Sequence, residues 1–137
     1  MATAPRPPTA GRLLSLLDEA TGDYFLVDTG ATYSVVPYSS SDTPRGPRIA
    51  TADRRPIPCW GRATRAITAG GKVFQVQVLL AAVAFPILGM DFLEAEGLDV
   101  SPRRRALLGE GRTRVPLHTP APDRVAAHLG VVAEPSA

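Results

Sequence analysis

The sequence predicts a single, mostly β domain with one short helix near its carboxyl-terminal part. The length of 137 residues suits one domain, and a hydrophobic share of 45% is ordinary for a globular chain. Fourteen prolines and twelve glycines together supply 26 residues, which favours short segments separated by turns over long helices. The clearest apolar periodicity in the chain repeats every second residue, as in a β-strand.

The apolar content lies between two segments that we expect to be tails. Residues 1–11 and 118–137 are rich in alanine, proline and small polar residues. They carry few apolar side chains whose burial could offset the entropy lost on ordering the chain. We therefore place the folded domain at residues 12–117.

Residues 13–17 and 24–27 are predicted to form a β-hairpin. The intervening Asp-Glu-Ala-Thr-Gly at residues 18–22 is typical of a turn. The second strand, Tyr-Phe-Leu-Val, is apolar on both faces, which predicts a buried strand.

The clearest strand spans residues 73–80 and follows a Gly-Gly turn. Its apolar and polar side chains alternate: Phe74, Val76, Val78 and Leu80 face one way, and Gln75 and Gln77 face the other. A short apolar run at 84–88 comes next. Residues 90–96 are mostly helix formers and precede Gly97, a residue type that often ends helices, so a helix of about two turns is predicted there.

Residues 98–100 and 106–108 are predicted to form a closing hairpin. Five arginines make this region positive: Arg103, Arg104, Arg105, Arg112 and Arg114. A solvated turn is favoured over an RNA contact, because no aromatic side chains that could stack on bases lie among the arginines.

Charge and cysteine content argue against several classes of protein. The net charge of +2 is too small to indicate a nucleic-acid partner from composition alone. Cys59 is the only cysteine, and His118 and His128 lie far from it in sequence, so we expect no disulfide and no metal. The chain lacks the roughly 18 consecutive apolar residues of a membrane span and the apolar core of a secretory signal. We therefore expect an intracellular protein with no membrane partner.

Asp28 stands at the end of a strand that is expected to be buried. It follows four apolar residues and precedes Thr29 and Gly30, so a rigid strand carries a carboxylate into a tight turn. Burying a charge there is costly unless it is shared or hydrogen-bonded. For an isolated Asp-x-Gly, an Asx turn at a strand end is the simpler interpretation.

The residues around Asp28 resemble a known active site. Residues 25–36, Phe-Leu-Val-Asp-Thr-Gly-Ala-Thr-Tyr-Ser-Val-Val, are similar to the active-site segment of the retropepsins, the aspartic proteases of retroviruses and LTR retrotransposons. Residues 86–93, Pro-Ile-Leu-Gly-Met-Asp-Phe-Leu, look like the second signature of that family. Residues 49–61 resemble the flap region of the gypsy-type retrotransposon proteases. The resemblance covers residues 12–108.

This resemblance implies a retropepsin-like acid protease fold, a small closed β barrel with one short helix, assembled as a homodimer. Hydrolysis with two carboxylates needs one ionised, as general base on a water, and one protonated, as general acid. The chain has no second Asp-Thr/Ser-Gly motif, which excludes a two-lobed, pepsin-like enzyme. A two-fold dimer that brings Asp28 against its symmetry mate would supply the second acid.

The implied activity is that of an aspartic endopeptidase without a cofactor. Its expected substrate is an extended polypeptide, namely the polyprotein from which the domain is released. We expect it to act in the cytoplasm or within virus-like particles.

Matching the family motifs residue by residue implies individual roles. Asp28 is the expected catalytic residue, and Thr29 and Gly30 are expected to support it. Leu88 and Gly89 belong to the second signature. The residues expected to contact substrate are Ala31, Thr32, Val35, Ala52, Asp53, Arg54 and Ile87, of which Val35 is equally well interpreted as core.

Three features depart from the pattern of the retroviral enzymes. An acid and an arginine that pair in many relatives are replaced by Thr32 and Met90, so dimer strength and substrate anchoring are less certain. Asp91 is expected to cap the first helical turn, or to place a favourable negative charge in it, rather than to join catalysis. The expected flap tip, residues 51–56, has no glycine, which predicts a stiffer flap.

Two competing functions remain open. The chain could be a weakly active or domesticated domain that serves as a dimerisation or peptide-binding module. Single-motif domains of ubiquitin-shuttle proteins are a third option, although the chain has no ubiquitin-like segment.

Overall fold

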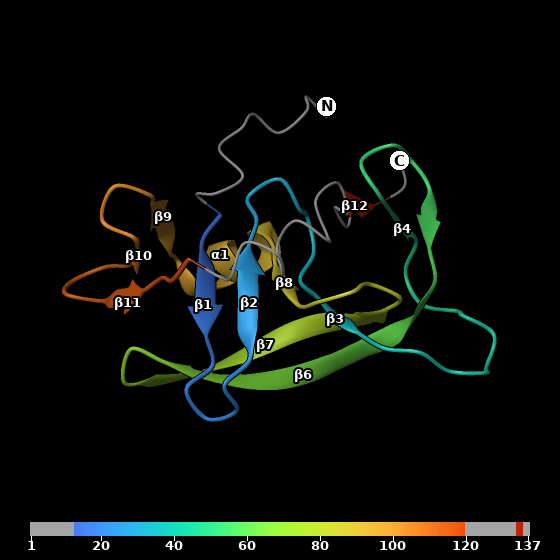
Figure 1. Cartoon of the computed structure of the whole chain (residues 1–137), viewed down its shortest axis with the longest axis horizontal. Helices are drawn as coiled ribbons and strands as arrows, with labels where there is room; N and C mark the ends of the chain where they lie inside the picture. Colours follow the sequence, from blue (N-terminus) through green and yellow to red (C-terminus); the bar gives the residue numbers. More distant parts are fainter. Residues whose placement is uncertain (1–12, 120–133, 136–137) are drawn as a thin grey trace.

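A computed structural model describes residues 13–119 and 134–135. The described chain forms three sheets and one helix (Figure 1). The largest sheet has the order β1 (Ser15–Leu17), β2 (Tyr24–Val27), β8 (Ile87–Leu88), β3 (Val35–Pro37), β7 (Lys72–Ala81) and β6 (Cys59–Ala69). The second has the order β11 (Arg114–Pro116), β10 (Ala106–Leu108) and β9 (Asp99–Ser101). The third has the order β12 (Glu134–Pro135), β4 (Ile49–Ala50) and β5 (Pro56–Ile57).

The predicted first hairpin is confirmed, since β1 and β2 pair antiparallel with Ser15 opposite Leu26. A buried carboxylate organises its turn. Asp18 accepts hydrogen bonds from the Ala20 amide, the Thr21 hydroxyl and, across the structure, the Thr68 amide of β6. The turn is therefore closed by its own hydrogen bonds and also attached to β6.

The centre of the main sheet brings together segments that are distant in sequence. β2 pairs parallel with β8, placing Leu26 opposite Ile87 and Val27 opposite Leu88. β3 pairs parallel with β7 and antiparallel with β8. The residues that follow β2 and the residues that follow β8 therefore lie side by side.

The predicted alternation of β7 is confirmed: Phe74, Val76 and Val78 are buried, and Gln75 and Gln77 are exposed. β6, its eleven-residue partner, was not predicted from the sequence. The two strands form a long ribbon along the bottom of Figure 1.

The helix α1 (Met90–Glu96) is confirmed, and Gly97 ends it at φ 64°. The closing hairpin is confirmed as β9 and β10, and β11 extends it to three strands. His118 exchanges two backbone hydrogen bonds with Ser15, both of 2.7 Å. His118, which the sequence places in the carboxyl-terminal tail, is thus tied to β1. Most of both expected tails lies outside the described residues.

The expected closed barrel is not found in the described part of the chain. β1 and β6 are the two edges of the six-stranded sheet and do not pair with each other as strands. β1 has only three residues before the turn, and β6 pairs only with β7 in its sheet. What links the two ends is the Asp18 turn, whose neighbour Glu19 donates its amide to the Thr68 carbonyl at 2.7 Å.

Two buried apolar clusters hold the sheets together. The larger one joins the first hairpin, the long ribbon, α1 and the β9–β11 sheet, with Phe25, Ile67 and Leu107 fully buried. The smaller one joins β2, β3 and β8 of the main sheet to β4 and β5. No helix in the described residues has the length and apolar character needed to cross a membrane.

Candidate active site

Asp28 follows β2 directly and is buried, with 7% of its surface exposed. Its amide donates to the Leu88 carbonyl of β8 at 2.9 Å, which anchors the turn to the neighbouring strand. One carboxylate oxygen accepts the Gly30 amide at 2.9 Å, and the carbonyl accepts the Ala31 amide at 3.1 Å. By itself this is the Asx turn that any strand-end aspartate can form. What distinguishes this turn is the structure packed behind it.

Gly89, in the second signature, is held against the loop that follows Asp28. A Cβ atom built there would lie 2.7 Å from the Ala31 carbonyl oxygen and 2.8 Å from that of Tyr33. The conflict is with backbone atoms, which cannot rotate away as a side chain can. Glycine is therefore needed because the two backbones touch.

A network of hydrogen bonds joins the residues after Asp28 to the start of α1. The Met90 amide donates to the Ala31 carbonyl at 2.8 Å, and the Asp91 amide to the Thr32 carbonyl at 3.1 Å. The Asp91 carboxylate accepts the Ser34 amide at 3.0 Å and the Ser34 hydroxyl at 2.7 Å. The Ser34 oxygen in turn accepts the Gly89 amide at 3.0 Å.

Asp91 therefore does more than was predicted. It places a negative charge in the first helical turn, as expected, and accepts the Phe92 amide at 2.7 Å, but it is not the cap: Gly89 is the N-cap, and no side chain caps the helix. It also clamps Ser34, which is fully buried and which the sequence interpretation did not single out. A buried serine inside an otherwise apolar run was the available signal, because such a hydroxyl needs a partner.

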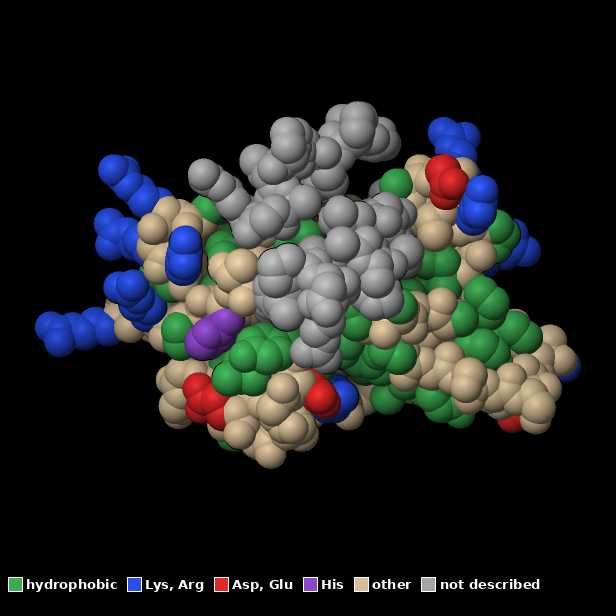
Figure 2. Space-filling view, in the orientation of Figure 1, with side chains coloured by type: hydrophobic (Ala, Val, Ile, Leu, Met, Phe, Trp, Pro, Cys, Tyr) green, Lys and Arg blue, Asp and Glu red, His purple; other side chains and the backbone are tan. Residues whose placement is uncertain are grey.

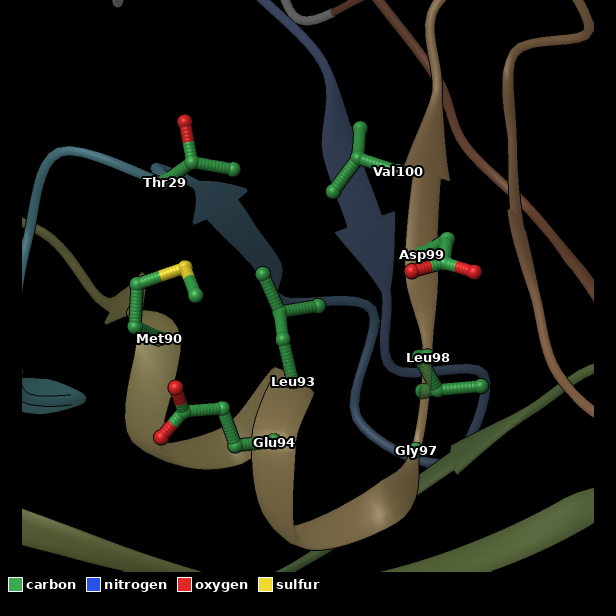
Figure 3. A pocket seen from close by; sticks show the side chains of 8 residues that line it. All are labelled: Thr29, Met90, Leu93, Glu94, Gly97, Leu98, Asp99 and Val100. Atoms are coloured by element: carbon green, nitrogen blue, oxygen red, sulfur yellow. The ribbon is translucent and has the colours of Figure 1, made fainter.

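Thr29 and Gly30 are exposed beside the buried Asp28. Thr29 lines a cavity of about 460 Å³ that is bounded mainly by α1 and β9 (Figure 3). The other lining residues are Met90, Leu93, Glu94, Gly97, Leu98, Asp99 and Val100. Asp28 is not among them, so this cavity is not itself a cleft over the candidate catalytic group.

The other residues expected to contact substrate fall into two places. Ala31, Val35 and Ile87 are almost completely buried and belong to the smaller apolar cluster. Thr32 is exposed. Ala52, Asp53 and Arg54 lie in the turn between β4 and β5, the hairpin that corresponds to the expected flap.

The flap tip is closed by its own side chains. The Thr51 amide donates to the Arg55 carbonyl at 2.8 Å, and the Thr51 hydroxyl oxygen accepts the Arg55 amide at 3.1 Å. The Thr51 hydroxyl also donates to the Asp53 carboxylate, which forms an exposed ion pair with Arg55 at 3.2 Å. Arg54 takes φ 69°, the conformation that glycine adopts most readily.

The pKa of Asp53 is held below its ordinary value of 3.8. The hydrogen bond from Thr51 is the largest cause, and the nearby Arg55 charge adds to it. At neutral pH the tip therefore carries an ionised Asp53 that contacts both Thr51 and Arg55.

No group of three or more His, Cys, Asp and Glu residues within the described ranges could hold a metal ion. Cys59 is buried, and its sulfur atom packs so close to Gly46 that a Cβ there would lie 2.8 Å away. His118 packs edge-on against Tyr24, and His128 lies outside the described residues.

Comparison with known proteins bears on the fold. No protein-family model matches the sequence, and no curated protein matches it either. The structure is similar to that of the retroviral protease-like domain of Ddi1 from Leishmania major, with a TM-score of 0.51 and 16% sequence identity. The match covers 77% of this chain and 94% of that one. The likeness shows a retropepsin-like fold.

Proposed function

We propose that this chain is an aspartic endopeptidase that works as a homodimer, with Asp28 of each copy forming one shared site. The observation that carries the proposal is the setting of Asp28. In a retropepsin-like fold, a buried strand delivers this carboxylate into a turn that the Gly89–Asp91 segment braces from behind. A turn that served only to end a strand would not need that second support.

The chemistry follows from two carboxylates that share one proton. The ionised carboxylate takes a proton from a water molecule as the water oxygen attacks the peptide carbonyl carbon. The protonated one gives its proton to the carbonyl oxygen. When the tetrahedral intermediate collapses, the C–N bond breaks and the amine leaves with a proton. One chain supplies one such acid, so the second must come from a symmetric partner.

The face beside Asp28 supports a partner copy. Thr29 is exposed there, and the cavity that it lines lies between α1 and β9 (Figure 3). β9 is the edge strand of its sheet, so its outer backbone groups are available for pairing with another strand. A second copy whose Asp28 approached this one would cover both features.

We further propose that the substrate is an extended polypeptide, the polyprotein of a retrotransposon of the gypsy type, cleaved in the cytoplasm or within virus-like particles. The β4 edge that does not face β5 pairs antiparallel with β12, another segment of this chain. Because this edge of β4 already pairs with one extended segment, we propose that a substrate strand could take the place of β12 there. The charged flap tip would then contribute Asp53 and Arg54 to recognition.

A binding module without catalysis is the second candidate. It is favoured by the absence of the acid–arginine pair at Thr32 and Met90 and by the closed flap tip. In this function, the same edge of β4 would hold a peptide without cleaving it.

Digestion of a peptide library between about pH 3 and 8 separates the two functions. The wild type should cleave, pepstatin should inhibit the cleavage, and Asp28→Asn should abolish it. Asp42→Asn is the matched control, because it removes one carboxylate from an exposed loop residue. Cleavage that persists in Asp28→Asn would rule out the proposed chemistry. Peptide binding without cleavage by the wild type would favour the module.

A further inference from the structure

A basic surface covers the end of the molecule formed by β9, β10 and β11 (Figure 2). We call it the arginine patch. All five of its members are exposed: Arg103, Arg104, Arg105, Arg112 and Arg114. In Figure 2, Lys and Arg side chains project outward at the left end of the view, where this sheet lies.

Charge is segregated onto this sheet. Residues 99–116 hold five arginines against Asp99 and Glu110, a net charge of +3. The whole chain carries only +2, so the remainder is net −1. A small net charge for the whole chain therefore hides a basic end, and the argument from composition against a polyanion does not apply to this surface.

The arginines are not neutralised within the described residues. The ion pairs there involve Arg55 and Arg65, both outside the patch. The Arg114 side chain donates instead to the carbonyl of Arg104 at 3.5 Å, which places it beside the turn between β9 and β10. Asp99 and Glu110 lie on the same sheet but form no ion pair with these arginines among the described residues, so a net positive charge remains that favours an anionic partner.

The turn that carries three of the arginines is well defined. The Arg105 amide donates to the Pro102 carbonyl at 3.2 Å, and the Arg104 amide to the Ser101 hydroxyl at 3.3 Å. Arg105 has φ 48°, a left-handed conformation that glycine would adopt at lower cost. The turn therefore fixes the backbone from which these three side chains extend.

We propose that the arginine patch binds the phosphate backbone of a nucleic-acid duplex. A guanidinium offers paired N–H groups that match phosphate oxygens, and a duplex presents phosphates at high density along its length. The exposed large hydrophobic side chains of the described chain are Tyr38 and Val73, and neither lies on this sheet. The patch thus has no large exposed hydrophobic side chain that could stack on bases or insert into a bilayer. We therefore expect it to bind the charged backbone without sequence specificity.

An acidic peptide fits this surface less well. Peptides are usually held in grooves or along strand edges with pockets for side chains. Four of these arginines instead lie on exposed turns, and only Arg114 lies in a strand, at the start of β11. The sequence had favoured a solvated turn because no aromatic residues lie among the arginines. That argument still excludes base stacking but leaves the phosphate contacts open.

The test measures fluorescence anisotropy of a labelled 24-base-pair duplex of mixed sequence with the full chain. Between about 50 and 200 mM salt, contact with three to five phosphates predicts a slope of log K against log salt of about −3 to −4.5. Arg103→Gln/Arg104→Gln/Arg112→Gln should reduce the steepness of that slope by about 2 to 3.

The matched control removes the same charge elsewhere. Arg45→Gln/Arg48→Gln/Arg62→Gln changes three exposed arginines outside the patch and should leave the slope unchanged. Asp28→Asn should also bind as the wild type does, because the patch does not depend on catalysis. Circular dichroism confirms that each variant is folded.

Three results would overturn the proposal. The duplex could fail to bind at the lowest salt, or the control could lose as much affinity as the patch variant. Alternatively, vesicles containing phosphatidylserine, or polyglutamate, could bind to the patch more tightly than the duplex at equal charge concentration.

Discussion

Asp91 links the two segments that build the candidate site. It lies 57 positions after Ser34, yet its carboxylate receives both polar hydrogens of that residue. Through Ser34 it also holds the Gly89 amide, and so the two signature segments are locked together. Under the proposed function, Asp91 is a positioning residue, because it acts on the Asp28 turn through other groups.

Under the proposed function, Asp91→Ala should lower kcat by roughly 10- to 100-fold with a smaller change in KM, because a shift of the loop misplaces Asp28. Asp91→Asn keeps a carbonyl acceptor and should recover part of the loss. Kinetics on a cleaved peptide, normalised to the folded fraction, test this. A variant that lost thermal stability but kept kcat per folded molecule would show that the clamp is only structural.

Asp18 illustrates a buried acid with a purely structural role. Desolvation raises its pKa. Hydrogen bonds from Thr68, Ala20 and Thr21 and the charge of Arg65 lower the pKa by more than desolvation raises it, so the net pKa lies below 3.8. A depressed folded-state pKa contributes stability that is present above the unfolded value and is lost as the pH falls through the folded value.

Asp18→Asn should therefore cost about 1–3 kcal/mol in the free energy of unfolding at pH 7. The gap from the wild type should shrink as the pH falls below about 4, because the carboxylate of the unfolded chain is protonated first, and it should go on shrinking as the pH falls through the lower folded-state value. Urea denaturation at pH 7 and pH 3 measures it, with Asp42→Asn as the exposed control. A gap that stayed constant or widened in acid would contradict the sign of the pKa shift.

At the scale of elements, predictability follows the strength of the local pattern. β7 was predictable because its apolar and polar residues alternate. α1 was predictable because helix formers run up to Gly97. β6 was missed, since Ile67 is the only large aliphatic residue among its eleven, and its pairing with β7 supplies the order that its own sequence lacks.

In the candidate site, too, the part made by neighbouring residues was predictable, and the part made by distant residues was not. The Asp28 turn was visible because an apolar strand and a turn-forming Asp-Thr-Gly are adjacent in sequence. The Ser34–Asp91 clamp was not visible, because it depends on the parallel pairing of β2 with β8. The closed barrel came from the family resemblance and is not found in the part of the chain that the structure describes, because closure would need pairing between the short β1 and the distant β6.

The flap tip makes its own prediction at this scale. Thr51→Val removes the hydroxyl that binds both Asp53 and the Arg55 amide, while keeping a β-branched side chain. Amide hydrogen exchange at residues 51–55 should accelerate by about five- to tenfold, the equivalent of one lost hydrogen bond. Exchange in β7 should not change. Equal exchange in both proteins at the tip would show that these bonds do not set its mobility.

At the scale of the whole molecule, three surfaces take part in the proposals, and β9 belongs to two of them. The turn at Asp28 and the exposed Thr29 form the face proposed to meet a second copy. The β4–β5 hairpin is proposed to take an extended substrate strand at the edge of β4 that β12 occupies here. The β9–β11 sheet carries the arginine patch at another end of the chain. A protease that also bound nucleic acid would be concentrated wherever its substrate was held near nucleic acid.

Mixing of subunits tests the shared site most directly. Wild type and Asp28→Asn are unfolded together, refolded at a fixed total concentration, and assayed for peptide cleavage over a range of wild-type fractions. If each site needs one Asp28 from each of two copies, activity should follow the square of the wild-type fraction, about one quarter at equal amounts. Mixing with Asp42→Asn should leave activity unchanged. Activity that instead fell in direct proportion to the wild-type fraction, to about one half, would mean that each chain acts alone.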